Sequence, residues 1–84
     1  MARTIYFAVG EILFEWDEEK AEGNLKKHHL SFEDGATVFK DYNALLLDDP
    51  DQFDDEVRFE LLGYSTKRQL LVVVHVDGVR DFAL

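Results

Sequence analysis

Apolar and polar residues alternate at the start of the chain. The period of two runs through residues 4–9 and returns after Gly10 through residues 12–16, where Phe14 and Trp16 are the largest members. Successive side chains of a strand point to opposite faces, so this alternation predicts two strands. Residues 1–12 are interpreted as a possible N-terminal extension strand.

At Asp17 the pattern changes to the period of a helix. Asp17 is placed as the N-cap, and the acidic residues Glu18 and Glu19 follow in the first turn, where they complement the positive end of the helix dipole. We expect the helix to run from about Glu18 to His29. Its stripe of small and apolar positions predicts that His28 lies along the buried side, and Gly23 in mid-helix indicates close packing.

A second, shorter helix is predicted after a one-residue link. Ser31 and Asp34 form a Ser-x-x-Asp capping pattern, in which each side chain would accept from a backbone N–H at the helix start. The apolar stripe is Phe32, Ala36 and Phe39, and the helix should end near Asp41. The two segments therefore predict a tight helical hairpin.

Period-two runs resume in the second half, in "ALLL", "EVRFELLGY" and "QLLVVVHV". The short "STKR" connection predicts that the last two runs pair antiparallel. "LLVVVHV" is apolar at successive positions, which predicts a central strand covered on both faces. Residues 48–56, "DDPDQFDDE", hold six acidic residues in nine and predict a solvated loop.

These elements predict one α+β domain over residues 1–84, with a strand, two helices and then a three-stranded antiparallel meander. The chain has no cysteine, and its apolar N-terminal run is broken by Gly10, Glu11 and Glu15. Neither a disulfide framework, a signal peptide nor a membrane span is therefore expected. A cytoplasmic location fits these features best.

The formal net charge of −9 is uneven along the chain. Residues 1–40 carry 5 basic and 8 acidic groups, and residues 41–84 carry 4 and 10. Such an average field repels nucleic acid, so direct DNA binding by this chain alone is not expected. Any basic patch must be local, and "KKHH", residues 26–29, is the candidate. Its simpler interpretation is a set of cations that complements the C-terminal end of the helix dipole.

The stretches "FEWDEEKAEGNLKKHHLSFEDGATVFKD" and "RFELLGYSTKRQLLVVVH" resemble the BrnT toxins, also known as the DUF497 family, of type II BrnT/BrnA toxin–antitoxin systems. The residues that carry the resemblance are Phe14, Trp16, Asp17, Lys20, Ala21, Asn24, Lys27, His28, Ser31, Phe32, Glu33, Ala36, Val38, Phe39, Asp41, Arg58, Gly63, Ser65, Leu71, Val73 and His75. So many residue types in order make a specific signal over about residues 13–76.

The resemblance implies a fold similar to the RelE and ParE toxins, an endoribonuclease activity on mRNA that arrests translation, and a ribbon-helix-helix antitoxin similar to BrnA as partner. RNA cleavage needs a base for the 2′-OH proton, an acid for the leaving oxygen and a cation near phosphorus. With the resemblance, these roles go to Lys27, His28, Arg58 and Arg80. Trp16, Lys20 and Lys26 would contact the RNA, although the favoured interpretation of Trp16 is a core residue.

Two departures from the family pattern stand out. His29 follows the Lys-His pair where the family usually has glycine, so the helix end should close in another way. The family continues past the last strand with an Arg-rich segment and a C-terminal helix, whereas this chain ends at "DGVRDFAL". We therefore expect an exposed apolar patch over the strands, covered in an oligomer or hetero-complex. The alternative to an active toxin is an inactive module that only binds its antitoxin, and a chance likeness in an unrelated acidic protein is a third hypothesis.

Metal and cofactor sites are not predicted. Asp49, Asp51, Asp55 and Glu60 copy four positions of an EF-hand loop, but Phe53 and Asp54 occupy positions where that loop needs a ligand and a glycine. His28 and His29 are adjacent and diverge by about 100 degrees on a helix, so they would not share one zinc ion. His75 is interpreted as a core histidine bonded to the backbone.

Overall fold

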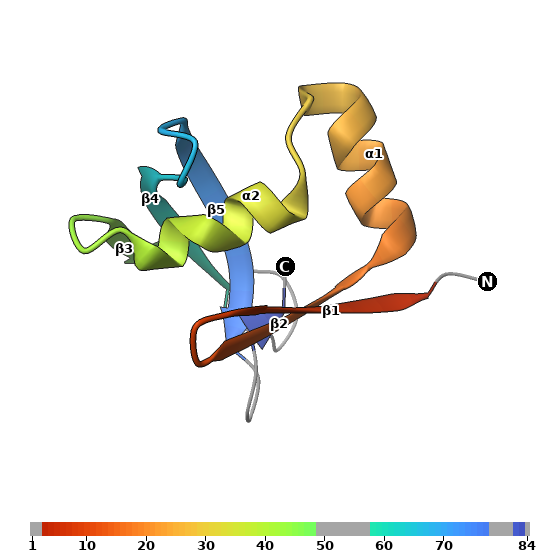
Figure 1. The fold of residues 1–84 in the computed structure, drawn as a ribbon, viewed down its shortest axis with the longest axis horizontal. Helices are drawn as coiled ribbons and strands as arrows, with labels where there is room; N and C mark the ends of the chain where they lie inside the picture. The colour runs from red at the N-terminus through yellow and green to blue at the C-terminus, as the bar shows by residue number, and fades with distance from the viewer. Residues whose placement is uncertain (1–2, 49–57, 78–81, 84) are drawn as a thin grey trace.

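The computed structural model describes residues 3–48, 58–77 and 82–83 of the 84-residue chain. Over these residues the fold is α+β, as predicted (Figure 1). Its elements are β1 (Thr4–Val9), β2 (Ile12–Asp17), α1 (Glu18–His28), α2 (Phe32–Ala36), the 3-10 helix η1 (Thr37–Lys40), β3 (Leu45–Asp48), β4 (Arg58–Tyr64), β5 (Leu70–Asp77) and β6 (Phe82–Ala83).

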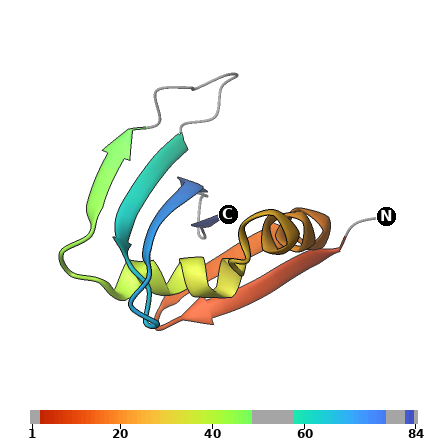
Figure 2. The same cartoon turned by 90° about the horizontal axis from the view of Figure 1, so that it is seen from above.

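The described strands form one sheet in the order β1-β2-β6-β5-β4-β3. The predicted meander is confirmed, because β3, β4 and β5 pair antiparallel in sequence order. The two predicted N-terminal strands pair antiparallel through a turn at Gly10, whose φ is 59°. β6 joins these two arms, parallel to β2 and antiparallel to β5. Figure 2 shows α2 and η1 crossing between the two arms.

The core lies where α2 and η1 meet the two arms. One cluster holds Val9, Phe14, Trp16 and Ala36, and the other holds Val38, Leu61 and Val73. Phe39 packs against both clusters, and its ring meets that of Phe14 edge-on at a centroid distance of 4.9 Å. The predicted stripe of the second helix therefore connects the N-terminal hairpin to the meander.

The helix starts follow the predicted capping chemistry. Asp17 Oδ1 accepts from the backbone N–H of Glu19 at 3.0 Å, and Ser31 Oγ accepts from that of Asp34 at 3.1 Å. The Asp34 carboxylate lies 3.4 Å from Lys67 Nζ, so it links the second helix to the β4–β5 hairpin. Ser31 thus caps as expected, while Asp34 serves a tertiary contact.

The C-terminal end of α1 corrects the expectation about His29. This residue adopts the left-handed conformation itself, with φ 57°, and its N–H donates to Leu25 O. The position usually taken by glycine is closed in the same geometry by a histidine, at the cost of some steric strain. The helix therefore ends as it would with glycine.

The expected packing of α1 was also wrong. No side chain of α1 is buried, Leu25 is 50% exposed and His28 is exposed. A Cβ added at Gly23 would meet nothing within 4 Å, so no close contact requires glycine there. The helix covers the end of β2 and the start of α2 with one narrow side, and the predicted stripe is too sparse to bury more.

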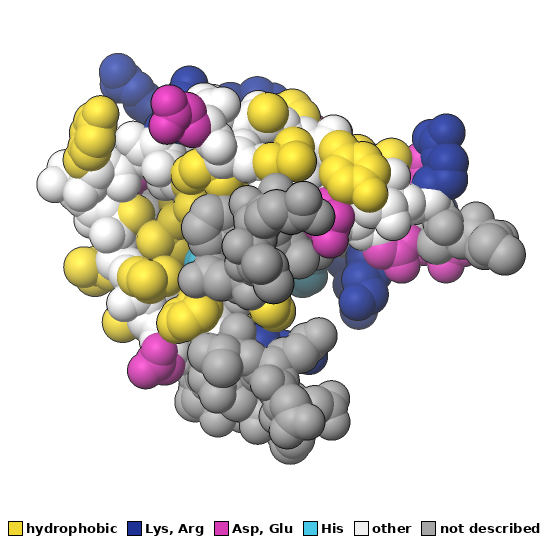
Figure 3. All heavy atoms as spheres, turned by 90° about the horizontal axis from the view of Figure 1, so that it is seen from below, with side chains coloured by type: hydrophobic (Ala, Val, Ile, Leu, Met, Phe, Trp, Pro, Cys, Tyr) yellow, Lys and Arg dark blue, Asp and Glu magenta, His cyan; other side chains and the backbone are white. Residues whose placement is uncertain are grey.

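β5 is covered on one face only, which corrects the prediction of a strand buried on both sides. Its inward residue Val73 is buried, whereas Leu70, Val72 and Val74 are each about half exposed. They continue across β4 and β3 into an apolar outer face formed by Leu45, Leu47, Leu62, Tyr64, Leu70, Val72 and Val74. In the view of Figure 3, hydrophobic side chains gather at the side of the molecule where β3 and β4 lie.

Candidate functional site

The basic end of α1 consists of Lys26, Lys27, His28 and His29. All four side chains are exposed in the last turn and cap of the helix. Consecutive helical residues are turned by about 100 degrees, so these side chains spread over a wide arc instead of converging on one point. The arrangement complements the helix dipole and at the same time presents cations and imidazoles to solvent.

Hydrogen bonds hold this helix end in place where burial does not. Asn24 Nδ2 donates to Leu30 O at 2.9 Å, across the connection to α2. The N–H of His29 donates to Leu25 O at 2.9 Å. These two bonds fix the direction in which the basic end of α1 projects.

Of the predicted catalytic residues, the structure describes Lys27, His28 and Arg58, and it does not place these three together. Lys27 and His28 share the basic end of α1, and Lys20 lies exposed earlier in the same helix. Side chains alternate along β4, and Leu61 faces the core, so Arg58 belongs to the outer face with Glu60 and Leu62. The helices pack against the opposite face. Arg80 lies outside the described residues.

Trp16 is a core residue, which was the favoured of its two interpretations. Its side chain is 4% exposed, and its ring lies 5.7 Å from that of Phe32 and 5.8 Å from that of Phe7. A ring enclosed in this way has no free face for a base. The expectation that Trp16 contacts RNA by stacking is therefore not supported by its position.

His75 lies in the core as interpreted from the sequence. It is 3% exposed, and its Nδ1 lies 3.3 Å from Val73 O. Its ring meets those of Phe39 and Phe59 at centroid distances of 4.9 and 5.9 Å. The histidine thus helps to pack the meander against η1.

Asp41, which the sequence pattern marks only as a helix end, connects the end of η1 to β4. Its Oδ2 accepts from the Tyr64 N–H at 2.8 Å, and its Oδ1 accepts from the Asn43 N–H at 2.9 Å. These bonds to Tyr64, and secondly to Asn43, lower the pKa of the Asp41 carboxyl. The bond from Asn43 to Asp41 is a common local turn, which a sequence can signal. The bond from Tyr64 joins residues far apart in the chain and has no local signal.

The Asp41→Asn variant should be less stable than the wild type at neutral pH, because an amide replaces the carboxylate that accepts from two N–H groups. A carboxyl with a lowered pKa adds stability above its unfolded value of about 3.9 and loses it as the pH falls through the folded value. The difference in urea midpoint between the two proteins should thus shrink under acid conditions. A difference that stays constant down to low pH would contradict this account.

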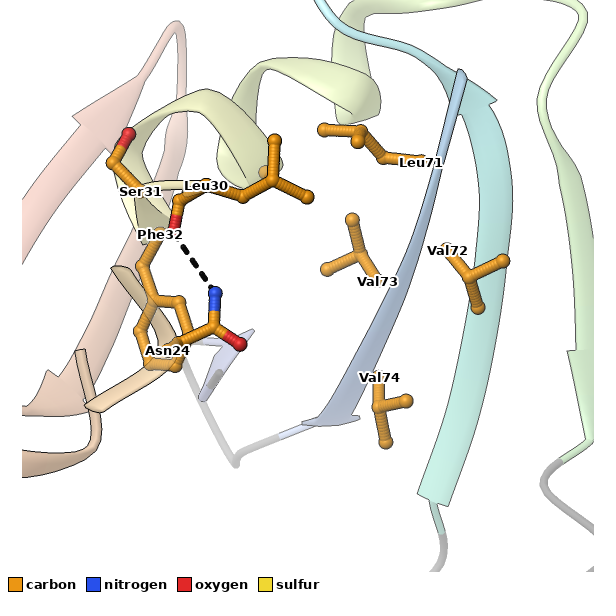
Figure 4. Close-up of a pocket in the computed structure, with 9 residues that line it drawn as sticks. Asn24, Leu30, Ser31, Phe32, Leu71, Val72, Val73 and Val74 are labelled. Carbon is orange, nitrogen blue, oxygen red and sulfur yellow. Dashed lines mark hydrogen bonds between the residues drawn. The ribbon is translucent and has the colours of Figure 1, made fainter. Parts of the chain in front are cut away.

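A cleft separates the α1–α2 connection from β5 (Figure 4). Its volume is about 250 Å³, and its walls include Asn24, Leu30, Phe32 and Val73. The sequence pattern does not reveal this cleft, because each of these residues fits an ordinary helix or strand pattern. Only the spacing of the elements in three dimensions creates it.

Neither a metal-binding cluster nor a membrane-spanning helix occurs among the described residues. The described residues contain no group of three or more histidine or acidic side chains placed to hold a metal ion. Asp49, Asp51 and Asp55 of the EF-hand-like stretch lie outside the described residues. Within the described ranges, the helices are too short and too polar to cross a bilayer.

A family model described as "Ribonuclease toxin, BrnT, of type II toxin-antitoxin system" matches residues 16–81. The match covers α1, α2, η1 and the meander, and it includes the basic end of α1. No curated protein and no solved structure matches the chain.

Proposed function

This chain belongs to the BrnT family of ribonuclease toxins of type II toxin–antitoxin systems, and we propose that it is a toxin that cleaves mRNA without a metal ion. The observation that carries the proposal is the family match over residues 16–81 together with the exposed basic end of α1 inside it. A toxin of this type acts with a protein antitoxin, so a BrnA-like antitoxin is the proposed partner. A fold related to the RelE and ParE toxins belongs to the same proposal.

The proposed chemistry starts from His28 and Lys27. An imidazole can take up or release a proton near neutral pH, which suits it to accept the 2′-OH proton or to protonate the leaving oxygen. A lysine ammonium beside it would stabilise the charge that builds on the phosphate. Lys26 and Lys20 lie on the same helix and would hold the neighbouring phosphates. The net charge of −9 restricts RNA contact to this region.

The proposed catalytic roles of Arg58 and Arg80 have less support than those of Lys27 and His28. Arg58 lies on the outer face of β4, so it would meet the scissile phosphate only if the RNA wraps around the sheet edge. Arg80 follows β5 in sequence and is assigned by resemblance alone. We therefore base the site on α1 and treat the two arginines as auxiliary contacts.

The test is cleavage of a defined mRNA by the purified chain in the presence of EDTA. We expect fragments that carry 2′,3′-cyclic phosphate ends, because attack by the 2′-OH forms that ring when no water is activated by a metal. Fragments that appear only with added divalent metal would overturn the proposed chemistry. An absence of cleavage under all conditions, together with antitoxin binding, would favour the alternative of a module that only binds its antitoxin.

A further inference from the structure

A groove lies where α1 and the start of α2 meet the β1–β2 hairpin. Its volume is about 260 Å³, and its walls come from residues 5–33. Figure 1 shows α1 rising from the end of this hairpin. β1 and β2 both contribute to the walls, whereas β6 pairs with the other edge of β2. None of the described residues of β5 or β6 lines this groove.

The floor of the groove is apolar. Trp16 lines it and is 4% exposed. Ile5, Ala21 and Phe32 are half-buried and pack against the core cluster that contains Trp16. Leu25 lies four residues after Ala21 on the same face of α1 and is 50% exposed. An apolar side chain of a partner would remove this surface from water, which is favourable.

Two carboxylates of the groove have no cationic partner. Glu22 on α1 and Glu33 on α2 line it and are exposed, and among the described residues no ion pair involves either of them. Glu18 differs, because its carboxylate pairs with Arg3 at 2.7 Å. Glu33 complements the dipole at the start of α2, but Glu22 lies in the middle of α1 and has no such role. We call the apolar floor together with these two unpaired carboxylates the acidic groove.

We propose that the acidic groove binds a basic segment of a partner protein. An apolar side chain of this segment would fill the hollow over Trp16, and an arginine or lysine on each side of it would pair with Glu22 and Glu33. Leu25 lies about one helical turn before His29, so the bound segment would end beside the proposed RNA site and obstruct the approach of RNA. That position suits an antitoxin, and in naming this partner the inference rests on the proposed function.

A basic segment of another protein fits the acidic groove better than a second copy of this chain. The basic residues 26–29 of a second copy are flanked by Leu25 and Leu30. Leu25 is a wall of the groove itself, and Leu30 lines the cleft beside β5, so neither could fill the hollow of another copy. Two chains of net charge −9 also repel each other at low ionic strength.

The first test measures binding of the synthetic peptide Gly-Ser-Arg-Leu-Arg-Leu-Arg-Ser-Gly to the whole chain in the absence of RNA. Trp16 is the only tryptophan of the sequence and lines the groove, so its fluorescence should change as the peptide binds. One control peptide has serine in place of leucine, and the other has citrulline, which keeps the shape of arginine without its charge. Each replacement should weaken binding by about fivefold or more. Unchanged binding of either control, or no binding of the parent peptide, would overturn the proposal.

The second test removes the two unpaired carboxylates from the protein. The Glu22→Gln/Glu33→Gln variant should bind the parent peptide about fivefold more weakly than the wild type, because both ion pairs are lost. Glu11→Gln/Asp48→Asn is the matched control, since it removes the same number of charges from exposed positions outside the groove. It should bind within about twofold of the wild type. Equal losses in the two variants would show a general attraction to the net charge and contradict a defined site.

The third test concerns the apolar floor. Leu25→Ala should weaken peptide binding by about fivefold, whereas Leu13→Ala removes a comparable side chain outside the groove and should leave binding unchanged. Leu25 and Leu13 are 50% and 38% exposed, so both variants should fold, which thermal unfolding checks. A dimer that the free wild type forms and the Leu25→Ala variant does not, measured by light scattering, would show that a second copy covers the groove and would overturn the proposal. RNA cleavage does not enter these tests, so their outcome is independent of the proposed activity.

Discussion

Replacing Gly63 by alanine should lower the free energy of unfolding by about 1–3 kcal/mol, the usual cost of overpacking a tight core. The added Cβ would lie 2.8 Å from Ala44 Cβ and 3.0 Å from both Val38 Cγ1 and Asp41 Oδ2. Ala44 Cβ is fixed to the backbone, and Val38 is fully buried, so neither can move aside. The strain would also disturb the bond between Asp41 Oδ2 and the Tyr64 N–H. Urea unfolding of the wild type and the Gly63→Ala variant measures this difference in the free energy of unfolding.

Gly23→Ala is the matched control for this substitution. Gly23 lies within α1, and a Cβ there would meet nothing within 4 Å. Alanine should therefore raise the free energy of unfolding by about 0.5–1 kcal/mol, because glycine in a helix loses more chain entropy on folding. Two changes of the same kind should thus have opposite signs. A loss of stability in both variants would contradict the contacts described around Gly63.

The elements that the sequence predicted are those whose signal is local. Asp17 and Ser31 mark helix starts through their own hydrogen bonds to the next turn, and the period of two marks β1, β2 and β4. Such signals need no information from distant parts of the chain. β6 has two residues and no period of its own, so its parallel pairing with β2 could not be predicted.

The failures share a different cause, which is that a pattern of apolar residues does not say what covers them. β5 has the composition of a strand buried on both faces, yet Val72 is 57% exposed. The stripe through α1 suggested burial for His28, but one narrow side of that helix meets the rest of the fold. In the candidate site, Lys27 and His28 lie together because they are adjacent in α1, whereas strand alternation and sheet order place Arg58 on the outer face, away from the helices.

The double variant Lys27→Ala/His28→Ala should lose RNA cleavage by a factor of at least 100, since removal of a general acid or base alone costs about 10²–10⁴. Both side chains are exposed, so the fold should persist with a small loss of stability from the weaker complement to the helix dipole. The measurement is the single-turnover rate on a defined mRNA, beside thermal unfolding of the same preparation. Retention of antitoxin binding would show that the fold and the partner surface are intact.

Lys40→Ala is the control for charge, because it removes an exposed cation from η1, outside the proposed site. Weaker attraction of RNA and loss of a catalytic group can be distinguished by measuring cleavage at several salt concentrations. A loss that comes from weaker electrostatic attraction of RNA shrinks as ionic strength rises, whereas the loss of a proton-transfer group does not. If Lys40→Ala slows cleavage as much as the double variant does, the basic end of α1 acts as a general attractor and the catalytic groups lie elsewhere. If the double variant alone fails at all salt concentrations, the chemistry resides at the end of α1, where the same two side chains also complement the helix dipole.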